Sequence, residues 1–95
     1  LTEVIQIYLD ELPEHLEAID TAMSGGDLRS LGLRAHALKS ASFNVGARSV
    51  GELCKRLERQ AKAGDAKGLA DIKSALDAAL ERTLPALRAE MKELA

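Results

Sequence analysis

The spacing of apolar residues constrains the fold most, because it follows a helical period along almost the whole chain. In residues 4–23 apolar side chains recur at intervals of four and three, which places them on one face of a helix. Pro13 lies inside this stripe, so we expect either one bent helix or a short helix followed by a longer one. Ser24, Gly25 and Gly26 then predict the end of the helix. The stripe consists of Ile5, Leu9, Leu12, Leu16, Ile19 and Met23.

Three further stripes of the same kind follow. The second begins after Asp27, which can cap a helix, and ends near Gly46. The third runs over 47–63, and the fourth follows Asp65, a second predicted cap, and passes through Pro85, where we expect another kink. Short connections force neighbouring helices to be antiparallel. The sequence therefore predicts an all-α fold, an antiparallel up-down-up-down four-helix bundle with a kinked or split N-terminal helix. The inward residues are Leu28, Leu31, Ala35, Leu38, Ser42, Val45, Val50, Leu53, Cys54, Leu57, Ala61, Leu69, Ile72, Leu76, Leu80, Leu84, Leu87, Met91 and Leu94.

Length and composition agree with one small helical domain spanning residues 1–95. The chain has 95 residues and only two aromatic side chains, so an aliphatic core must hold it together. It contains no apolar run of the roughly 20 residues that a membrane span needs, and no secretory signal. It begins at Leu1, which suggests a fragment of a longer protein. A single cysteine, Cys54, is expected in the core, and it favours a reducing, cytoplasmic compartment.

Charge is unevenly distributed along the chain. Residues 1–27 contain seven acidic side chains and no Lys or Arg, whereas residues 28–62 contain eight basic side chains and two acidic ones. The middle of the chain therefore favours an anionic ligand or an acidic partner surface. A nucleic-acid face is the alternative, but aromatic interleaving and a DNA-binding motif are missing and the net charge is −2. We therefore expect no nucleic-acid partner.

The basic segment contains a histidine, His36, that points away from the predicted core. Around it lie a cation one turn away and small side chains, which would let a partner approach the ring closely. Its predicted neighbours on this face are Arg29, Gly32, Lys39, Ser40 and Phe43. Phe43 could instead be a core residue at the rim, but a docking role is the interpretation that we favour. The other histidine, His15, is expected to be an ordinary solvated residue.

A carboxylate on the third helix could orient this histidine. His36 lies ten residues before Gly46 and Glu58 lies twelve after it, so on antiparallel helices they reach similar heights of about 15 and 18 Å. A carboxylate that accepts from Nδ1–H fixes the tautomer and leaves Nε2 as a nucleophile. The alternative is that Glu58 pairs only with cations of its own helix, namely Lys55, Arg59 or Lys62.

The stretch AHALKSASFNVGARSVGELCKRLE, residues 35–58, resembles the histidine phosphotransfer (HPt) domain of bacterial phosphorelays. In that family a histidine is followed by an apolar residue, a lysine, small residues, a glycine ten positions on and a Leu-Cys-x-x-Leu-Glu segment. The corresponding residues here are His36, Leu38, Lys39, Ala41, Gly46 and the run 53–58. One position departs, because Ser40 stands where the family most often has glycine.

The resemblance implies a role for each matching residue. His36 would accept a phosphoryl group at Nε2 from the aspartyl phosphate of a response-regulator receiver domain and pass it to another receiver. Lys39 would stabilise the phosphoryl charge, and Glu58 would hold the imidazole. The receiver would dock on Arg29, Gly32, Ser40 and Phe43. Mg²⁺ is expected on the receiver, so no metal or cofactor is expected on this chain.

The resemblance also suggests a setting. We expect a cytoplasmic monomer that forms the C-terminal part of a hybrid sensor kinase and is tethered to the inner membrane only through that parent. Whether the polypeptide counts as an enzyme stays open, since no glycine-rich nucleotide-binding sequence is present and autonomous kinase activity is not expected. Two alternatives remain: the phosphoacceptor domain of a chemotaxis-type histidine kinase, and a helical adaptor that is not phosphorylated.

Overall fold

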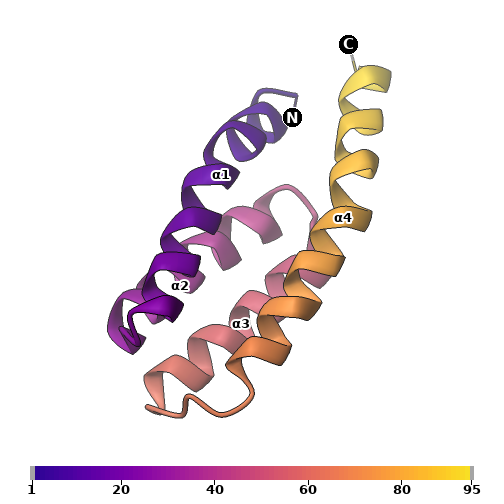
Figure 1. Cartoon of the computed structure of the whole chain (residues 1–95). Helices are drawn as coiled ribbons and strands as arrows, with labels where there is room; N and C mark the ends of the chain where they lie inside the picture. The colour runs from indigo at the N-terminus through magenta and orange to yellow at the C-terminus, as the bar shows by residue number, and fades with distance from the viewer. Residues whose placement is uncertain (1, 95) are drawn as a thin grey trace.

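The computed structural model describes residues 2–94, and these residues form four helices with no strand. The helices are α1 (Thr2–Ser24), α2 (Leu28–Asn44), α3 (Arg48–Lys62) and α4 (Leu69–Leu94). Successive helices run antiparallel in an up-down-up-down arrangement (Figure 1), which confirms the predicted all-α bundle. None of the described helices combines the length and apolar character needed to cross a membrane.

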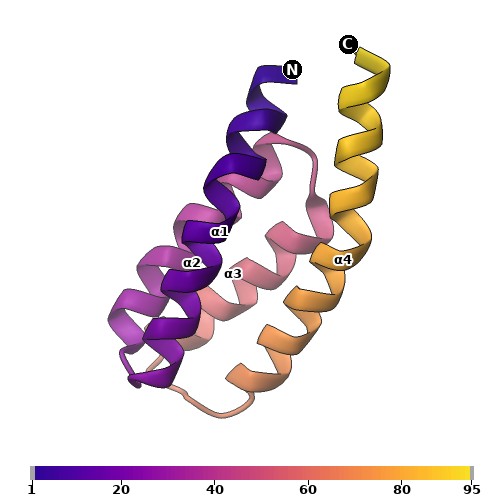
Figure 2. The ribbon, with the colours of Figure 1, turned by 45° about the horizontal axis from the view of Figure 1, so that its top comes forward.

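The bundle is elongated, with extents of 43 × 18 × 17 Å. Its most extensive helix–helix interface joins α2 and α3, and the smallest of its four helix–helix interfaces joins α1 and α4. The N-terminal end of α1 and the C-terminal end of α4 lie at the same end of the molecule and extend beyond the connection between α2 and α3 (Figure 2). The α2–α3 pair, which contains the basic segment, forms one side of the bundle, with α1 packed on α2 and α4 packed on α3.

The predicted stripes meet in one core of Leu, Ile, Val and Ala side chains with Cys54 among them. Tyr8 and Ala22 of α1 are also buried, although the stripe did not include them. Leu94 was predicted to face inward, and this is wrong, because it is 49% exposed. It lies in the last turn of α4, and the C-terminal end of this helix extends past α2 and α3 (Figure 1).

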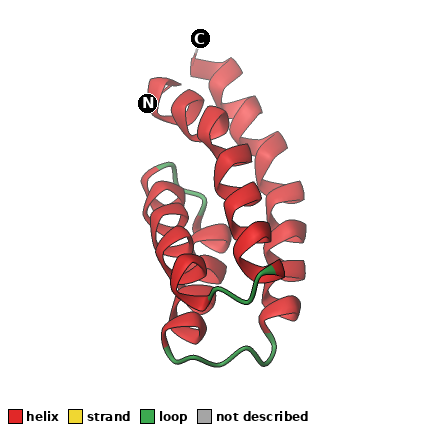
Figure 3. Ribbon diagram, turned by 60° about the vertical axis from the view of Figure 1, so that its left-hand side comes forward, coloured by secondary structure: helices red, strands yellow, loops and turns green. Residues whose placement is uncertain are grey.

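Both helices that contain proline are continuous. The alternative of two helices separated at Pro13 is wrong, since α1 runs unbroken from Thr2 to Ser24. Figure 3 shows that α1 changes direction along its length, in agreement with the bent-helix alternative. Bending relieves the clash of the proline ring with the preceding turn, and Pro13 is exposed, so its ring takes no space from the core. Helix α4 likewise continues through Pro85.

The helix ends that flank α2 follow the prediction. Asp27 caps α2, because its Oδ1 accepts from the backbone N–H of Ser30 at 3.0 Å. At the other end Gly46 adopts φ 78°, and the N–H of Gly46 donates to the carbonyl of Phe43 while that of Ala47 donates to Ser42. This left-handed glycine ends α2 and turns the chain into α3.

Asp65 does not cap α4, which corrects the prediction. Its Oδ1 accepts from the backbone N–H of Lys67 at 2.9 Å, within the connection between α3 and α4. Gly68 then adopts φ 78°, and α4 begins only at Leu69. The left-handed glycine inserts an extra turn between the carboxylate and the helix, so Asp65 stabilises the connection instead.

A buried polar contact joins α1 to α2. The hydroxyl of Tyr8 lies 2.9 Å from Oγ of Ser42, and both side chains are buried. Burial raises the pKa of Tyr8, although the hydrogen bond to Ser42 opposes this effect. Because each hydroxyl satisfies the other, this pair can fix the position of α1 on α2 without leaving an unpaired polar group in the core.

Candidate functional site

His36 and Glu58 meet across the α2–α3 interface. The side chain of His36 is 59% exposed, while that of Glu58 is only 7% exposed, and Nδ1 of the imidazole lies 2.8 Å from Oε2 of the carboxylate. The predicted approach of these two side chains is therefore confirmed. It arises because the tight turn at Gly46 folds α3 back on α2 and brings residues 22 apart in sequence to the same height.

Two lysines complete the surroundings of the carboxylate. Lys39 of α2 donates from Nζ to Oε1 at 2.7 Å, and Lys62 of α3 lies 3.0 Å from Oε2. Burial alone would raise the pKa of this carboxyl, but the hydrogen bonds from Lys39, Lys62 and His36 outweigh burial and lower the pKa to about 2. Glu58 is therefore ionised at neutral pH.

The ionised carboxylate determines the tautomer of His36. A carboxylate can only accept hydrogen bonds, so Nδ1 must be the ring nitrogen that carries the proton in this contact. In the neutral imidazole the lone pair then lies on Nε2. More than half of the side chain is exposed, so a partner can reach the imidazole in this tautomer.

Glu58 combines both interpretations that the sequence left open. It contacts Nδ1 of His36 across the interface, and it also pairs with Lys62 of its own helix. Lys39 was expected to point toward an incoming group, yet here its ammonium holds Glu58 and only 23% of its side chain is exposed. Sequence reasoning did not include Lys62 in the site, although its spacing of i+4 from Glu58 was a signal for contact.

A hollow of about 520 Å³ lies beside the imidazole, between α2 and α3. Predicted docking residues Arg29 and Gly32 line it. Gly32, however, is buried and does not face outward: a Cβ there would lie 3.6 Å from Cβ of Ala61. Its role is thus to let α2 approach α3. The remaining lining residues are Leu28, Leu33, His36, Glu58, Ala61 and Lys62.

The other two predicted docking residues lie outside this hollow. Ser40 is exposed, one turn beyond His36. Phe43 is 40% exposed, but its ring also packs on α3, since a Cβ on Gly51 would lie only 2.7 Å from a ring carbon. Phe43 is therefore both a rim residue of the core and a surface residue. Leu33, which sequence reasoning missed, is more exposed, at 66%.

His15 lies on α1 and does not line the hollow beside His36. It is half-buried rather than fully solvated, and its Nδ1 is 3.4 Å from a guanidinium nitrogen of Arg34. Burial, followed by the nearby charge of Arg34, lowers the pKa of His15. Cys54 is buried as predicted, and burial raises its pKa to about 12, so it is not a reactive thiol.

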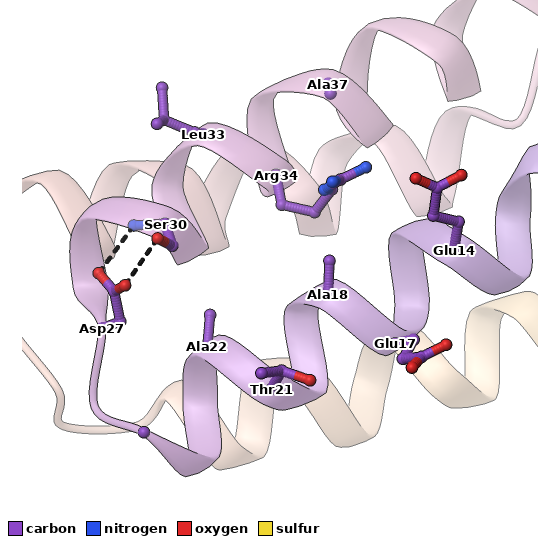
Figure 4. A pocket seen from close by; sticks show the side chains of 11 residues that line it. Glu14, Glu17, Ala18, Thr21, Ala22, Asp27, Ser30, Leu33, Arg34 and Ala37 are labelled. Atoms are coloured by element: carbon purple, nitrogen blue, oxygen red, sulfur yellow. Dashed lines mark hydrogen bonds between the residues drawn. The ribbon is translucent and has the colours of Figure 1, made fainter.

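A larger hollow, of about 940 Å³, lies between α1 and α2 and does not include His36. Figure 4 shows Arg34 extending from α2 toward α1, with Glu14 and Glu17 on α1 and Asp27 at the α2 cap. Asp27 is occupied by Ser30, through both its N–H and its hydroxyl. No imidazole or thiol lines this groove, so the α2–α3 face is the stronger candidate for group-transfer chemistry.

Within residues 2–94 no group of three or more His, Cys, Asp or Glu side chains could hold a metal ion. The expectation that the chain takes no metal stays a prediction. In a comparison with protein families, the model described as the Hpt domain matches residues 3–94, nearly the whole chain. Searches of curated proteins and of solved structures gave no match.

Proposed function

The chain belongs to the Hpt domain family, whose members are phosphocarriers in phosphorelays and interact with receiver domains, and on this premise we propose that His36 carries the phosphoryl group. The observation that carries the proposal is the 2.8 Å contact between Nδ1 of His36 and the ionised carboxylate of Glu58. It leaves Nε2 as an exposed lone pair, whereas His15 has Nδ1 against Arg34 and is half-buried.

The proposed transfer is an in-line exchange of one bond for another. The Nε2 lone pair attacks the phosphorus of an aspartyl phosphate, a P–N bond forms, and the P–O bond to the aspartate breaks. The aspartate leaves with the electron pair as a carboxylate, and the proton on Nδ1 stays in place. The positive charge that develops on the ring is stabilised by Glu58, 2.8 Å away. The reverse reaction passes the phosphoryl group to a second receiver.

Lys39 supports this chemistry through Glu58 in the resting state. It holds Oε1 at 2.7 Å and so keeps the carboxylate turned toward the imidazole. Because this ammonium shares the carboxylate of Glu58 with the imidazole, its positive charge also lowers the energy of an arriving phosphoryl group. We therefore retain Lys39 as a phosphoryl-stabilising residue and add a positioning role.

The proposed partner surface surrounds His36 on the α2–α3 face. Arg29 and the hollow provide positive charge and apolar lining on one side, while Ser40 and Phe43 lie on the other. A receiver's acidic pocket, which would also hold the Mg²⁺, complements this charge. We propose that the domain acts as a monomer in the cytoplasm, within a hybrid sensor kinase.

The test is phosphoryl transfer from a radiolabelled receiver domain, purified after its own phosphorylation. The expected result is acid-labile, base-stable label on the wild type and none on His36→Gln. His15→Gln is the matched control, because it removes the only other imidazole and should accept label normally. Equal labelling of the wild type and His36→Gln would refute the assignment. Labelling that requires ATP and a kinase domain instead of a receiver would favour the chemotaxis-type alternative.

A further inference from the structure

Lys62 shares a carboxylate oxygen with the proposed phosphoacceptor. Its Nζ lies 3.0 Å from Oε2 of Glu58, the same oxygen that accepts from Nδ1 of His36 at 2.8 Å. The ammonium is therefore within about 6 Å of the imidazole, close enough for a charge on the ring to act on it. Lys62 also lines the hollow that the imidazole borders, whereas Lys39 does not.

Phosphorylation would change the charge balance of this cluster. Two ammonium groups and one carboxylate leave the resting cluster with a net positive charge. A phosphoryl group on Nε2 carries close to two negative charges at pH 7, while the ring that keeps its Nδ1 proton gains one positive charge, so the cluster becomes more negative by about one charge. Repulsion between the phosphoryl oxygens and the carboxylate then favours the movement of a cation from the carboxylate to the phosphoryl group.

The geometry distinguishes the two lysines. Lys39 is mostly buried and, among residues 2–94, is the only side-chain donor to Oε1, so its departure would leave a buried carboxylate oxygen unpaired. Lys62 is 70% exposed, and the oxygen that it contacts would still accept from His36 after it left. Moving Lys62 therefore costs little, while moving Lys39 costs a buried hydrogen bond.

We propose that Lys62 is a second phosphoryl-binding residue, which leaves Oε2 of Glu58 when His36 is phosphorylated and contacts a phosphoryl oxygen from the side of the hollow. This inference rests on the proposed role of His36. It assigns separate tasks to the two lysines: Lys39 keeps Glu58 in position throughout, and Lys62 exchanges between the carboxylate and the phosphoryl group.

The test uses phosphoramidate, a small phosphodonor that needs no receiver domain, on the whole domain. The ³¹P resonance of phosphorylated His36 is followed through a pH titration in the wild type, Lys62→Gln, Lys62→Arg and Lys55→Gln. A cation in contact disfavours protonation of the phosphoryl group, so Lys62→Gln should raise its proton affinity by about tenfold. Lys62→Arg should restore the wild-type curve. Lys55→Gln, which alters an exposed lysine of the same helix, should not change it.

A second readout separates phosphoryl binding from a purely structural role. Before phosphorylation, ¹⁵N shifts of the His36 ring in Lys62→Gln should match the wild type, because Glu58 still accepts from Nδ1. An unchanged ³¹P titration in Lys62→Gln would overturn the proposal. Altered ring shifts of His36 together with a loss of stability in this variant would also overturn it, because Lys62 would then serve only to hold Glu58 in place. Labelling by phosphoramidate without transfer from a receiver would count against the proposed function alone. No labelling of His36 by either route would overturn both.

Discussion

Replacing Glu58 by glutamine would remove the charge that holds three donors together while preserving the shape of the side chain. The amide has one acceptor oxygen instead of two. Its NH₂ group would therefore face either Lys39 or the pair of His36 and Lys62, and these donors would lose their acceptor. We therefore expect the variant to fold, to be less stable than the wild type at neutral pH, and to lose the fixed tautomer of His36.

The magnitude follows from the pKa of the carboxyl group. Its decrease from 4.5 to about 2 corresponds to at most about 3 kcal/mol of stability at neutral pH. Two of the three donors, His36 and Lys62, are more than half exposed, so water replaces part of what they lose. A loss of about 1–2 kcal/mol remains, which corresponds to a decrease in Tm of about 4–15 °C for a domain of this size.

The direction in which stability changes with pH follows from the lowered pKa of Glu58. Because the folded pKa lies below the unfolded one, the stabilisation is complete above pH 4.5 and is lost as the pH falls toward 2. The stability of Glu58→Gln should therefore differ from that of the wild type at pH 7 and converge with it near pH 2.

Thermal unfolding followed by circular dichroism across this range measures both curves. Glu52→Gln, at an exposed carboxylate of the same helix, is the control and should stay close to the wild type throughout. Equal stability of Glu58→Gln and the wild type at pH 7 would refute the reasoning. So would a difference between them that stays constant down to pH 2.

Three further substitutions test other parts of the account. Tyr8→Phe leaves the buried Ser42 hydroxyl without its partner and should cost about 1–2 kcal/mol in urea unfolding; a change close to zero would show that the contact contributes nothing. Gly51→Ala places a methyl group 2.7 Å from the ring of Phe43, so the ring must swing outward. The gain in helix propensity, about 1 kcal/mol, should offset the lost packing, and an altered transfer rate at unchanged Tm would identify Phe43 as a docking residue. Ser40→Gly should preserve or raise the rate of transfer from a receiver, at a cost of about 0.5 kcal/mol in stability; a complete loss of transfer would mean that the hydroxyl takes part in the chemistry.

Much of the fold was predictable because the sequence signals of a helix lie within the helix and at its two ends. The 3.6-residue period, the Asp27 cap and Gly46 each depend on neighbours within a few positions, and the structure confirms all three. The contact of His36 with Glu58 was also predictable, since a tight turn between two antiparallel helices fixes which residues share a height.

The errors concern features that depend on distant parts of the chain. Leu94 has the right periodicity to be buried, but it lies in the last turn of α4 and is 49% exposed. Gly32 was placed on the outer face, yet the close packing of α2 on α3 buries it. Helical spacing alone allows Lys62 to reach the carboxylate of Glu58. It does not predict that Lys39 and His36 of α2 will contact the same carboxylate, because this depends on how the side chains pack across the interface.

The position of the phosphoryl group on the imidazole of His36 tests the central claim most directly. The domain is ¹⁵N-labelled at histidine, phosphorylated by a receiver, and examined for the ring nitrogen that is coupled to phosphorus. The account predicts phosphorus on Nε2, with Nδ1 still protonated and bonded to Glu58. Phosphorus on Nδ1, or on any residue other than His36, would contradict it.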